Sequence, residues 1–543
     1  MPPKETTKPV PLTKPILLAA AGGILQTLSW PQPGWWPLCL VSVAALVLAI
    51  DGQSGRRGFG LGWVYGLSLG LSSLPWLADV LAGYGGLGPV LGWFIIFLLA
   101  AFLGLFKALF GWLITWRPRL VLAWPLMGAV AWCGLDWVQN WIFTGFNWTP
   151  LAGPLVLSES LGQSADLFGF YGLGFFVALI NFYLALAWLG RRQNRKAWLV
   201  PLASALVILV AGHIYGQRQY DRWESVALAS PARLVAVVQP CTEQIQKWDA
   251  VYRQQLMTHF EGLTKQALTH KPWLILWPET AMPFFFDYDY QESEWLRGLS
   301  SQSDSFMLAG LAGISDFWPN QKFHNRMIFF DKGEPVSYYD KMHLVPFGEY
   351  LPLDWLPFLK WAFMQGLIGA AGIYSPGVPT EPIEIPLDPD GPPSGKKVKL
   401  GIMICFESTF PYIGRQRIRE GAEILVVPTN DGWFGRSRAP EQHLWQSAMR
   451  AIETRRSLVR AGNTGISGVI HPSGHIKNSS RLHEVGSFAF SLPVLAEKDL
   501  TTTFFVSFGH LLASGAAAIT CGLLILNFAL KRRVKSANQI SKE

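Results

Sequence analysis

The chain begins and ends with long apolar stretches that enclose a more polar central region. A membrane span needs about 20 mostly apolar residues, and eight stretches approach or reach that length. The first two are short and are separated by the turn-forming run 31–34, so a single re-entrant hairpin is an alternative for them. The pattern predicts a membrane α-helical bundle of about eight spans, at about 15–30, 35–50, 58–78, 88–114, 120–142, 166–189, 197–215 and 509–530.

The central region has a different pattern. Short β-rich runs such as 233–239, 274–277 and 398–405 alternate with helical stretches such as 249–269 and 440–457. Continuous apolar strands that alternate with helices are typical of buried sheets covered by helices, which predicts an α/β domain. The predicted organisation is a transmembrane bundle over 1–216 with about seven spans, an extracytoplasmic catalytic domain over 217–508, a C-terminal transmembrane helix over 509–530 and a basic cytoplasmic tail over 531–543.

Composition supports a membrane protein. Half of the residues are hydrophobic and only 15% are charged, whereas soluble domains carry about 25% charged residues. Residues 217–508 hold 28 Lys and Arg against 30 Asp and Glu, which leaves 17 basic and 7 acidic residues for the apolar flanks. Because the positive charge belongs to the flanks, it forms no phosphate-binding face, and nucleic acid is excluded as a partner.

The charges between the apolar stretches alternate along the chain. Basic loops occur near 56–57, 117–119, 191–196 and 531–533, while the loops at 31–34, 79–87 and 143–165 have no Lys or Arg. Under the positive-inside rule, both termini lie in the cytoplasm and the central domain lies outside. Two charged residues fall within predicted spans. Asp136 is either functional or a structural hydrogen-bonding group, and Lys107 is expected to extend to the inner interface.

The five cysteines show no metal-binding spacing. Cys241 and Cys405 are the two in the polar region, and a single bridge between them is an open alternative. The histidines form no paired metal motif, so surface or hydrogen-bonding roles are expected for them. No metal site is predicted.

Three residues at predicted strand ends carry the chemistry. Glu279, Lys341 and Cys405 each follow a strand, and side chains at strand ends converge on one crevice in α/β domains. A carboxylate can accept the thiol proton, and an ammonium can stabilise the oxyanion that forms when the thiolate attacks a carbonyl. Singly, each residue has a simpler interpretation: a buried apolar thiol, a turn-capping carboxylate or a solvated surface charge.

The motifs around these residues resemble a known family. Glu279 in WPET, Lys341 in DKMHLVPFGE and Cys405 in ICFES are similar to the Glu-Lys-Cys triad of the nitrilase (carbon–nitrogen hydrolase) superfamily. The flanking spans and the VPFGEY segment resemble the apolipoprotein N-acyltransferase family. The resemblance implies an αββα sandwich on eight spans, in a bacterial inner membrane with the catalytic domain on the periplasmic side.

The same resemblance implies a two-step acyl transfer without any cofactor or metal. Cys405 would take the sn-1 acyl chain of a phospholipid such as phosphatidylethanolamine, and a diacylglyceryl-cysteine of an apolipoprotein would receive it on its α-amino group. Glu279 would be the base, and Lys341 would stabilise the oxyanion. A monomer is expected. Supporting roles are implied for Glu349, Glu407 and the backbone N–H of Phe406, and substrate-binding roles for Trp248, Asn325, Trp433 and Trp148.

Three alternatives stay open. The apolar stretch 351–373 is expected to be a lid that dips into the membrane interface, with a core helix as the alternative. A membrane-tethered amidase would use the same triad with water as the acceptor. A lipid transporter or scaffold is a remote alternative, because it predicts several buried charges or an internal repeat in the spans, and the sequence shows only Asp136 and Lys107 and no repeat.

The sequence departs from the family pattern at two positions. The family usually has a tyrosine at the position of Phe406 and a proline at that of Asn147, so the fine positioning of the site is expected to differ here.

Overall fold

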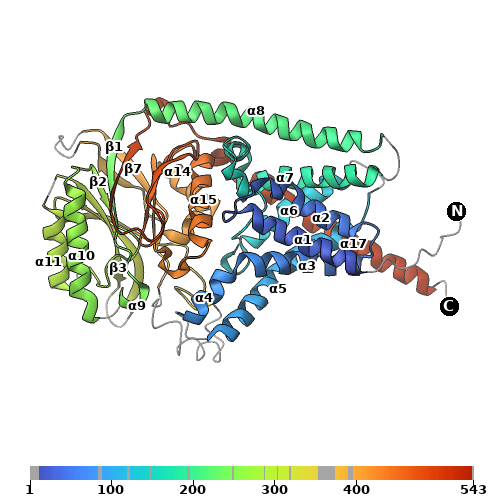
Figure 1. Cartoon of the computed structure of the whole chain (residues 1–543), viewed down its shortest axis with the longest axis horizontal. Helices are drawn as coiled ribbons and strands as arrows, with labels where there is room; N and C mark the ends of the chain where they lie inside the picture. The colour runs from blue at the N-terminus through green and yellow to red at the C-terminus, as the bar shows by residue number, and fades with distance from the viewer. Residues whose placement is uncertain are drawn as a thin grey trace.

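The computed structural model describes residues 12–83, 88–118, 123–146, 148–191, 196–247, 250–286, 288–302, 304–316, 320–352, 374–388 and 395–540. A helical bundle and a sandwich of two β-sheets lie end to end (Figure 1). The long helix α8 (Leu199–Ala229) runs from the bundle to the edge of the sandwich. Most of the segment predicted to be a lid or a core helix, from residue 353 to 373, lies outside the described residues.

A helix occupies each of the eight predicted apolar stretches, but only some of them reach the length of a membrane span. Among the described helices, four segments are long and apolar enough: 88–114, 161–190, 199–229 and 511–529. The bent pair α3 (Gly55–Ser73) and α4 (Pro75–Gly83), with an angle of 55° between its helices, would make a fifth. Several apolar helices can therefore cross a membrane, while the predicted count of eight is not confirmed. Besides α3, α4 and α8, the bundle contains α1 (Thr13–Ser29), α2 (Cys39–Ile50), α5 (Gly88–Ile114), α6 (Ala123–Gln139), α7 (Ala165–Gly190) and α17 (Leu511–Ile540).

The two charged residues of the predicted spans form a pair. Lys107 on α5 donates to Asp136 on α6, and both side chains are buried. Trp132 donates its indole N–H to Asp136 at 3.0 Å and also lies beneath the Lys107 ammonium. The expectation that Lys107 extends to the inner interface is therefore wrong, because a buried carboxylate one helix away compensates its charge.

Each sheet of the sandwich has three parallel strands at its centre and antiparallel strands at its edges. In the first sheet β1, β2 and β3 are parallel, and in the second β7, β8 and β9 are parallel. The first sheet has the order β12-β1-β2-β3-β4-β5, with β1 (Ala232–Gln239), β2 (Leu274–Leu276), β3 (Phe306–Ser315), β4 (Lys322–Asp331), β5 (Glu334–Asp340) and β12 (Gly486–Pro493). The second has the order β11-β10-β9-β8-β7-β6, with β6 (Ile383–Pro386), β7 (Lys397–Ile402), β8 (Ile424–Thr429), β9 (Ser457–Gly462), β10 (Gly468–Ile470) and β11 (Ile476–Ser479).

Alternating strand residues divide the apolar side chains between two faces of each sheet. Val235 and Val237 enter the core between the sheets, where they meet Val426 and Val459 of the second sheet. The intervening Ala236 packs outward, with side chains of α10 (Ala250–Leu268) and α11 (Tyr290–Ser300). On the far side, α14 (Pro411–Arg419) and α15 (Ala439–Thr454) cover the second sheet. The predicted αββα sandwich is confirmed.

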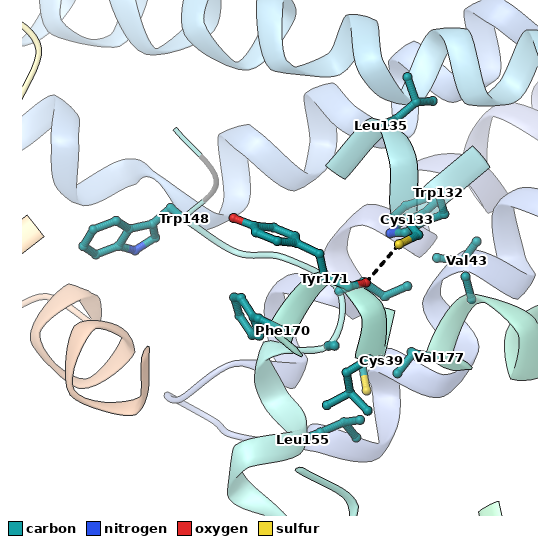
Figure 2. Packing of buried hydrophobic residues seen from close by; sticks show 14 of the residues in the cluster. Cys39, Val43, Trp132, Cys133, Leu135, Trp148, Leu155, Phe170, Tyr171 and Val177 are labelled. Carbon is teal, nitrogen blue, oxygen red and sulfur yellow. Dashed lines mark hydrogen bonds between the residues drawn. The ribbon is translucent and has the colours of Figure 1, made fainter. Parts of the chain in front are cut away.

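The outer helices of the second sheet also contact the bundle. Trp148 lies at the side of the bundle that faces α15 (Figure 2), and its indole N–H donates to Gln442 at 2.6 Å. Arg455, directly after α15, forms an ion pair with Asp166 of α7 at 2.7 Å. Glu453 accepts a hydrogen bond from the backbone N–H of Phe170 at 2.7 Å. These buried polar contacts fix the sandwich to the bundle.

Candidate active site

The three predicted catalytic residues come from three different strand ends. Glu279 follows β2, Lys341 follows β5, and Cys405 follows β7 in a short 3₁₀ turn over Cys405–Thr409. The first two belong to one sheet and the third to the other, so the site lies where the two sheets face each other. All three side chains are buried, and Glu279 is hydrogen-bonded to both Lys341 and Cys405.

Lys341 connects two carboxylates. Its Nζ donates to Glu279 Oε1 at 3.0 Å and to Glu349 Oε1 at 2.9 Å, and only 1% of its side chain is exposed. Burial alone would lower the pKa of Lys341, but the two carboxylates raise it well above its usual value. The ammonium is therefore charged at neutral pH, as oxyanion stabilisation requires.

Glu279 accepts hydrogen bonds at both carboxylate oxygens. Oε1 accepts from Asn325 Nδ2 at 2.7 Å, and Oε2 accepts from the backbone N–H of Asn430 at 2.8 Å. Burial raises its pKa, but the Lys341 charge and these hydrogen bonds outweigh burial and leave the pKa below its usual value. Glu279 is thus an ionised carboxylate that is held in one orientation, as a general base must be.

Cys405 has a backbone conformation that is unusual for a residue with a side chain. Its φ is +52°, in the left-handed region, because the chain turns sharply between β7 and the 3₁₀ turn. Such a conformation costs about 1–3 kcal/mol and is common at active sites. Burial, followed by the negative charge of Glu279, raises the pKa of the thiol. Cys405 is therefore a neutral thiol at rest, and Glu279 can accept its proton as the thiol attacks a substrate.

Glu349 and Glu407, for which the resemblance implies supporting roles, lie next to Lys341 and to the turn of Cys405. Glu349 Oε2 accepts from the backbone N–H of Val345 at 2.8 Å, which orients the carboxylate toward Lys341. Glu407 is fully buried and accepts hydrogen bonds from the backbone N–H groups of Ile404 and Met342, at 2.7 and 2.8 Å. Ile404 precedes Cys405 and Met342 follows Lys341, so Glu407 connects the two chain segments that carry the thiol and the ammonium.

Three of the four predicted substrate-binding residues are among those that the structure describes. Asn325 lies within the site, where its amide donates to both Glu279 and Glu349. Trp148 lies at the contact with the bundle and packs against Phe434 at a ring distance of 5.7 Å. Trp433 is half-buried next to Phe434 in a 3₁₀ turn. Trp248 lies outside the described residues.

Several residues of the site were missed by sequence reasoning. Lys247 is fully buried, and its Nζ donates to the backbone carbonyl of Glu279 at 3.4 Å. Burial lowers its pKa to about 8, against the opposing effect of the Glu279 charge. Tyr339 donates to Glu407 at 3.0 Å. The backbone N–H of Asn430 donates to Glu279, a contact that only the structure shows.

The site contains no disulfide. Cys241 and Cys405 are both free thiols, which excludes the bridge between them that the sequence left open. Cys241 instead donates weakly to the carbonyl of Glu484 at 3.3 Å.

Two family models match the chain. The model of the apolipoprotein N-acyltransferase N-terminal domain matches residues 22–183, and the carbon–nitrogen hydrolase model matches residues 234–480. The apolipoprotein N-acyltransferase of Geobacter metallireducens is 32% identical over 86% of this chain and 87% of its own length. The chain belongs to the apolipoprotein N-acyltransferase family. This membership confirms the resemblance and identifies the chain as an acyltransferase with a carbon–nitrogen hydrolase domain.

Other relatives in this family cover similar lengths. The enzyme of Nitrosomonas europaea is 31% identical over 85% of this chain and 88% of its own length. That of Methylococcus capsulatus is 29% identical over 97% and 98%. Among solved structures, Nit3 of Saccharomyces cerevisiae, a nitrilase-superfamily member, aligns with 16% identity, a TM-score of 0.36, and coverage of 48% of this chain and 90% of its own. A TM-score of this size supports no argument about the site.

Proposed function

We propose that this acyltransferase moves a phospholipid acyl chain to the α-amino group of a diacylglyceryl-cysteine on an apolipoprotein, through a thioester on Cys405. The observation that carries the proposal is the Lys341 ammonium, held between Glu279 and Glu349 at 3.0 and 2.9 Å beside a thiol in a strained turn. A neutral thiol, an ionised carboxylate and a fixed cation are the groups that acyl transfer through cysteine needs.

In the first step Glu279 takes the Cys405 proton while the sulfur attacks the ester carbon of the donor. Lys341 stabilises the tetrahedral oxyanion, and the backbone N–H of Phe406 is a second donor for it. The carbon–oxygen bond to glycerol breaks, and the protonated Glu279 returns its proton to the leaving lysophospholipid. A thioester remains on Cys405.

In the second step the acceptor amine attacks the thioester carbonyl. Glu279 takes the proton that the amine loses and returns it to the Cys405 sulfur as the carbon–sulfur bond breaks. The product is an amide, and the enzyme returns to its starting protonation state. Lys341 again stabilises the oxyanion, so the same three side chains serve both steps.

The aromatic surroundings of the turn support a lipid donor. Phe406 stacks on Phe146 at a ring distance of 6.4 Å. Phe146 in turn lines a narrow cavity of about 30 Å³ that lies between α3, α5 and α6 of the bundle. Aromatic rings thus link the bundle to the turn that carries the nucleophile, and these apolar surroundings suit an acyl chain better than a small polar amide.

We also propose the orientation that the charge pattern predicts. The start of α1 and the end of α17 lie at the end of the bundle opposite the sandwich (Figure 1). Both termini would then be cytoplasmic, with the catalytic domain over 217–508 on the periplasmic side of a bacterial inner membrane.

Intact mass spectrometry tests the proposed function. The purified protein is incubated with phosphatidylethanolamine and no acceptor. We expect a fatty-acyl mass increment that hydroxylamine removes and that Cys405→Ala abolishes. Absence of the increment in a folded wild-type protein would refute the phospholipid donor, and release of free ammonia from small amides would then favour the amidase.

A further inference from the structure

Behind the nucleophile lies a buried polar network that the proposed mechanism does not use. Asp431, His443 and Arg460 are fully buried and come from the turn after β8, from α15 and from β9. Arg460 Nη2 donates to Asp431 Oδ2 at 2.7 Å and lies 3.0 Å from His443 Nδ1. His443 Nδ1 also lies 3.0 Å from Asp431 Oδ1.

The other ring nitrogen of His443 contacts the nucleophile itself. His443 Nε2 lies 2.9 Å from the backbone carbonyl oxygen of Cys405. Since a carbonyl only accepts, Nε2 must carry a hydrogen. On the opposite side, Nδ1 lies 3.0 Å from both the Asp431 carboxylate and the Arg460 guanidinium. These two groups hold the imidazole ring in one orientation, with Nε2–H directed at the Cys405 carbonyl.

The hydrogen bond from His443 restrains the turn in which Cys405 has its unusual backbone conformation. The Cys405 carbonyl accepts a second hydrogen bond from Ser408 Oγ at 2.9 Å, so two buried donors converge on one oxygen. Fixing the carbonyl of a residue with a φ of +52° also fixes the direction of its side chain and of the peptide N–H that follows it. A nucleophile that is misplaced by about 1 Å can lose about 100-fold in rate.

We propose that His443 is a positioning residue for acyl transfer: its Nε2–H holds the Cys405 carbonyl, and Arg460 with Asp431 holds the imidazole ring in this orientation. The inference rests on the proposed function, because its main measurement is acylation of Cys405. His443 takes no proton from the thiol, since the hydrogen on Nε2 points at the Cys405 carbonyl and Nδ1 faces Asp431 and Arg460.

A metal ion is a poorer interpretation of the same cluster. The ligand atoms of Cys405, Asp431 and His443 lie within 4.8 Å of one another. However, both nitrogens of His443 already have hydrogen-bonding partners, and the Arg460 guanidinium donates to the Asp431 carboxylate. A cation placed there would face a buried positive charge and would have to displace these bonds.

Two variants that differ by one methylene test the proposal. In His443→Gln the amide nitrogen can reach the position of Nε2 and donate to Cys405. In His443→Asn it reaches only the position of Nδ1, near Asp431 and Arg460. His259→Gln is the matched control, because His259 Nε2 makes the same kind of bond to the backbone carbonyl of Pro240, at 3.1 Å. The measurement is the rate of acyl-enzyme formation against phosphatidylethanolamine concentration.

We expect His443→Gln to keep the maximal acylation rate within about tenfold of wild type, and His443→Asn to lose about 100-fold, with the half-saturating lipid concentration unchanged in both. The control should keep the wild-type rate. Equal rates in the two His443 variants, or a faster Asn variant, would overturn the proposal. If either variant does not fold, Ser408→Ala replaces the pair: a loss of about tenfold is expected, and a wild-type rate would overturn it.

Failure of the proposed function gives a different result. If wild type itself forms no acyl-enzyme, the lipid donor is wrong whatever His443 does. The variants are then compared by the rate at which iodoacetamide alkylates Cys405, followed on the Cys405 peptide. This rate reports nucleophile positioning without any lipid. The same order, with Gln close to wild type and Asn much slower, is expected, and equal rates would again overturn the proposal.

Discussion

Lys341→Met should destabilise the protein in a pH-dependent way. The substitution removes an ammonium that compensates the buried carboxylates Glu279 and Glu349, at 3.0 and 2.9 Å. Removing one partner of a buried ion pair costs about 3–5 kcal/mol. Asn325 still donates to both carboxylates, which places the expected cost near the lower end, at about 3 kcal/mol. Acylation should also fall by about 10²–10³-fold, the usual loss for an oxyanion donor.

The sign of the pH effect follows from the pKa of Glu279. In the wild type, burial raises this pKa, but Lys341 outweighs burial and holds it below its usual value. The carboxylate therefore stabilises the fold above its unfolded pKa, and this stabilisation is lost as the pH falls through the lower folded pKa. In Lys341→Met burial dominates and raises the pKa, so the variant loses stability as the pH rises.

Thermal unfolding in detergent at pH 8 and pH 5 measures this difference. At about 2–4 °C per kcal/mol, the variant should unfold roughly 6–12 °C below wild type at pH 8, and the gap should narrow at pH 5. The matched control is Lys265→Met, whose exposed pair with Glu261 at 2.6 Å should contribute less than about 1 kcal/mol. An equal gap at both pH values would refute the idea that Lys341 compensates the buried carboxylates.

Two further predictions concern backbone packing beside Glu279 and the contact between the sandwich and the helical bundle. Gly310→Ala places a methyl group against the backbone of residues 278–280, which carries Glu279, so acylation should fall by about 100-fold. The control Gly262→Ala, in a helix with open space around it, should keep full activity and gain about 0.5–1 kcal/mol. Arg455→Met leaves Asp166 without its buried cation and should lower stability by about 3 kcal/mol. Calorimetry checks this loss, and a melting temperature equal to wild type would contradict it.

The convergence of the three proposed catalytic residues could be predicted because local signals mark their positions. Glu279, Lys341 and Cys405 each follow a short apolar run, and the ends of such strands converge for topological reasons. The network behind Cys405 has no such signal. Asp431 and Arg460 are 29 residues apart in the chain and meet only because β8 and β9 pair in parallel. A sequence pattern cannot show which side chain faces which across two elements.

The helical bundle, too, could be predicted from the sequence only in part. The apolar stretches were located correctly, but the number of spans depends on helix length and bending. α1 and α6 each have 17 residues, and α3 and α4 are bent by 55°. The pair between Lys107 and Asp136 was missed because α5 and α6 bring the two residues together from 29 positions apart. Hydropathy locates apolar stretches, whereas helix packing decides which charges they compensate.

The apolar cluster that joins α14 and α15 to the bundle has a consequence for the independence of the two parts. Side chains such as Ile413 and Leu444 belong to the same continuous cluster as Phe110 and Trp132. The outer face of these two helices is therefore apolar, where a free-standing sandwich would need a surface that water can cover. A sandwich cut from the bundle would expose this apolar face, so the two parts depend on each other for solubility as well as for position.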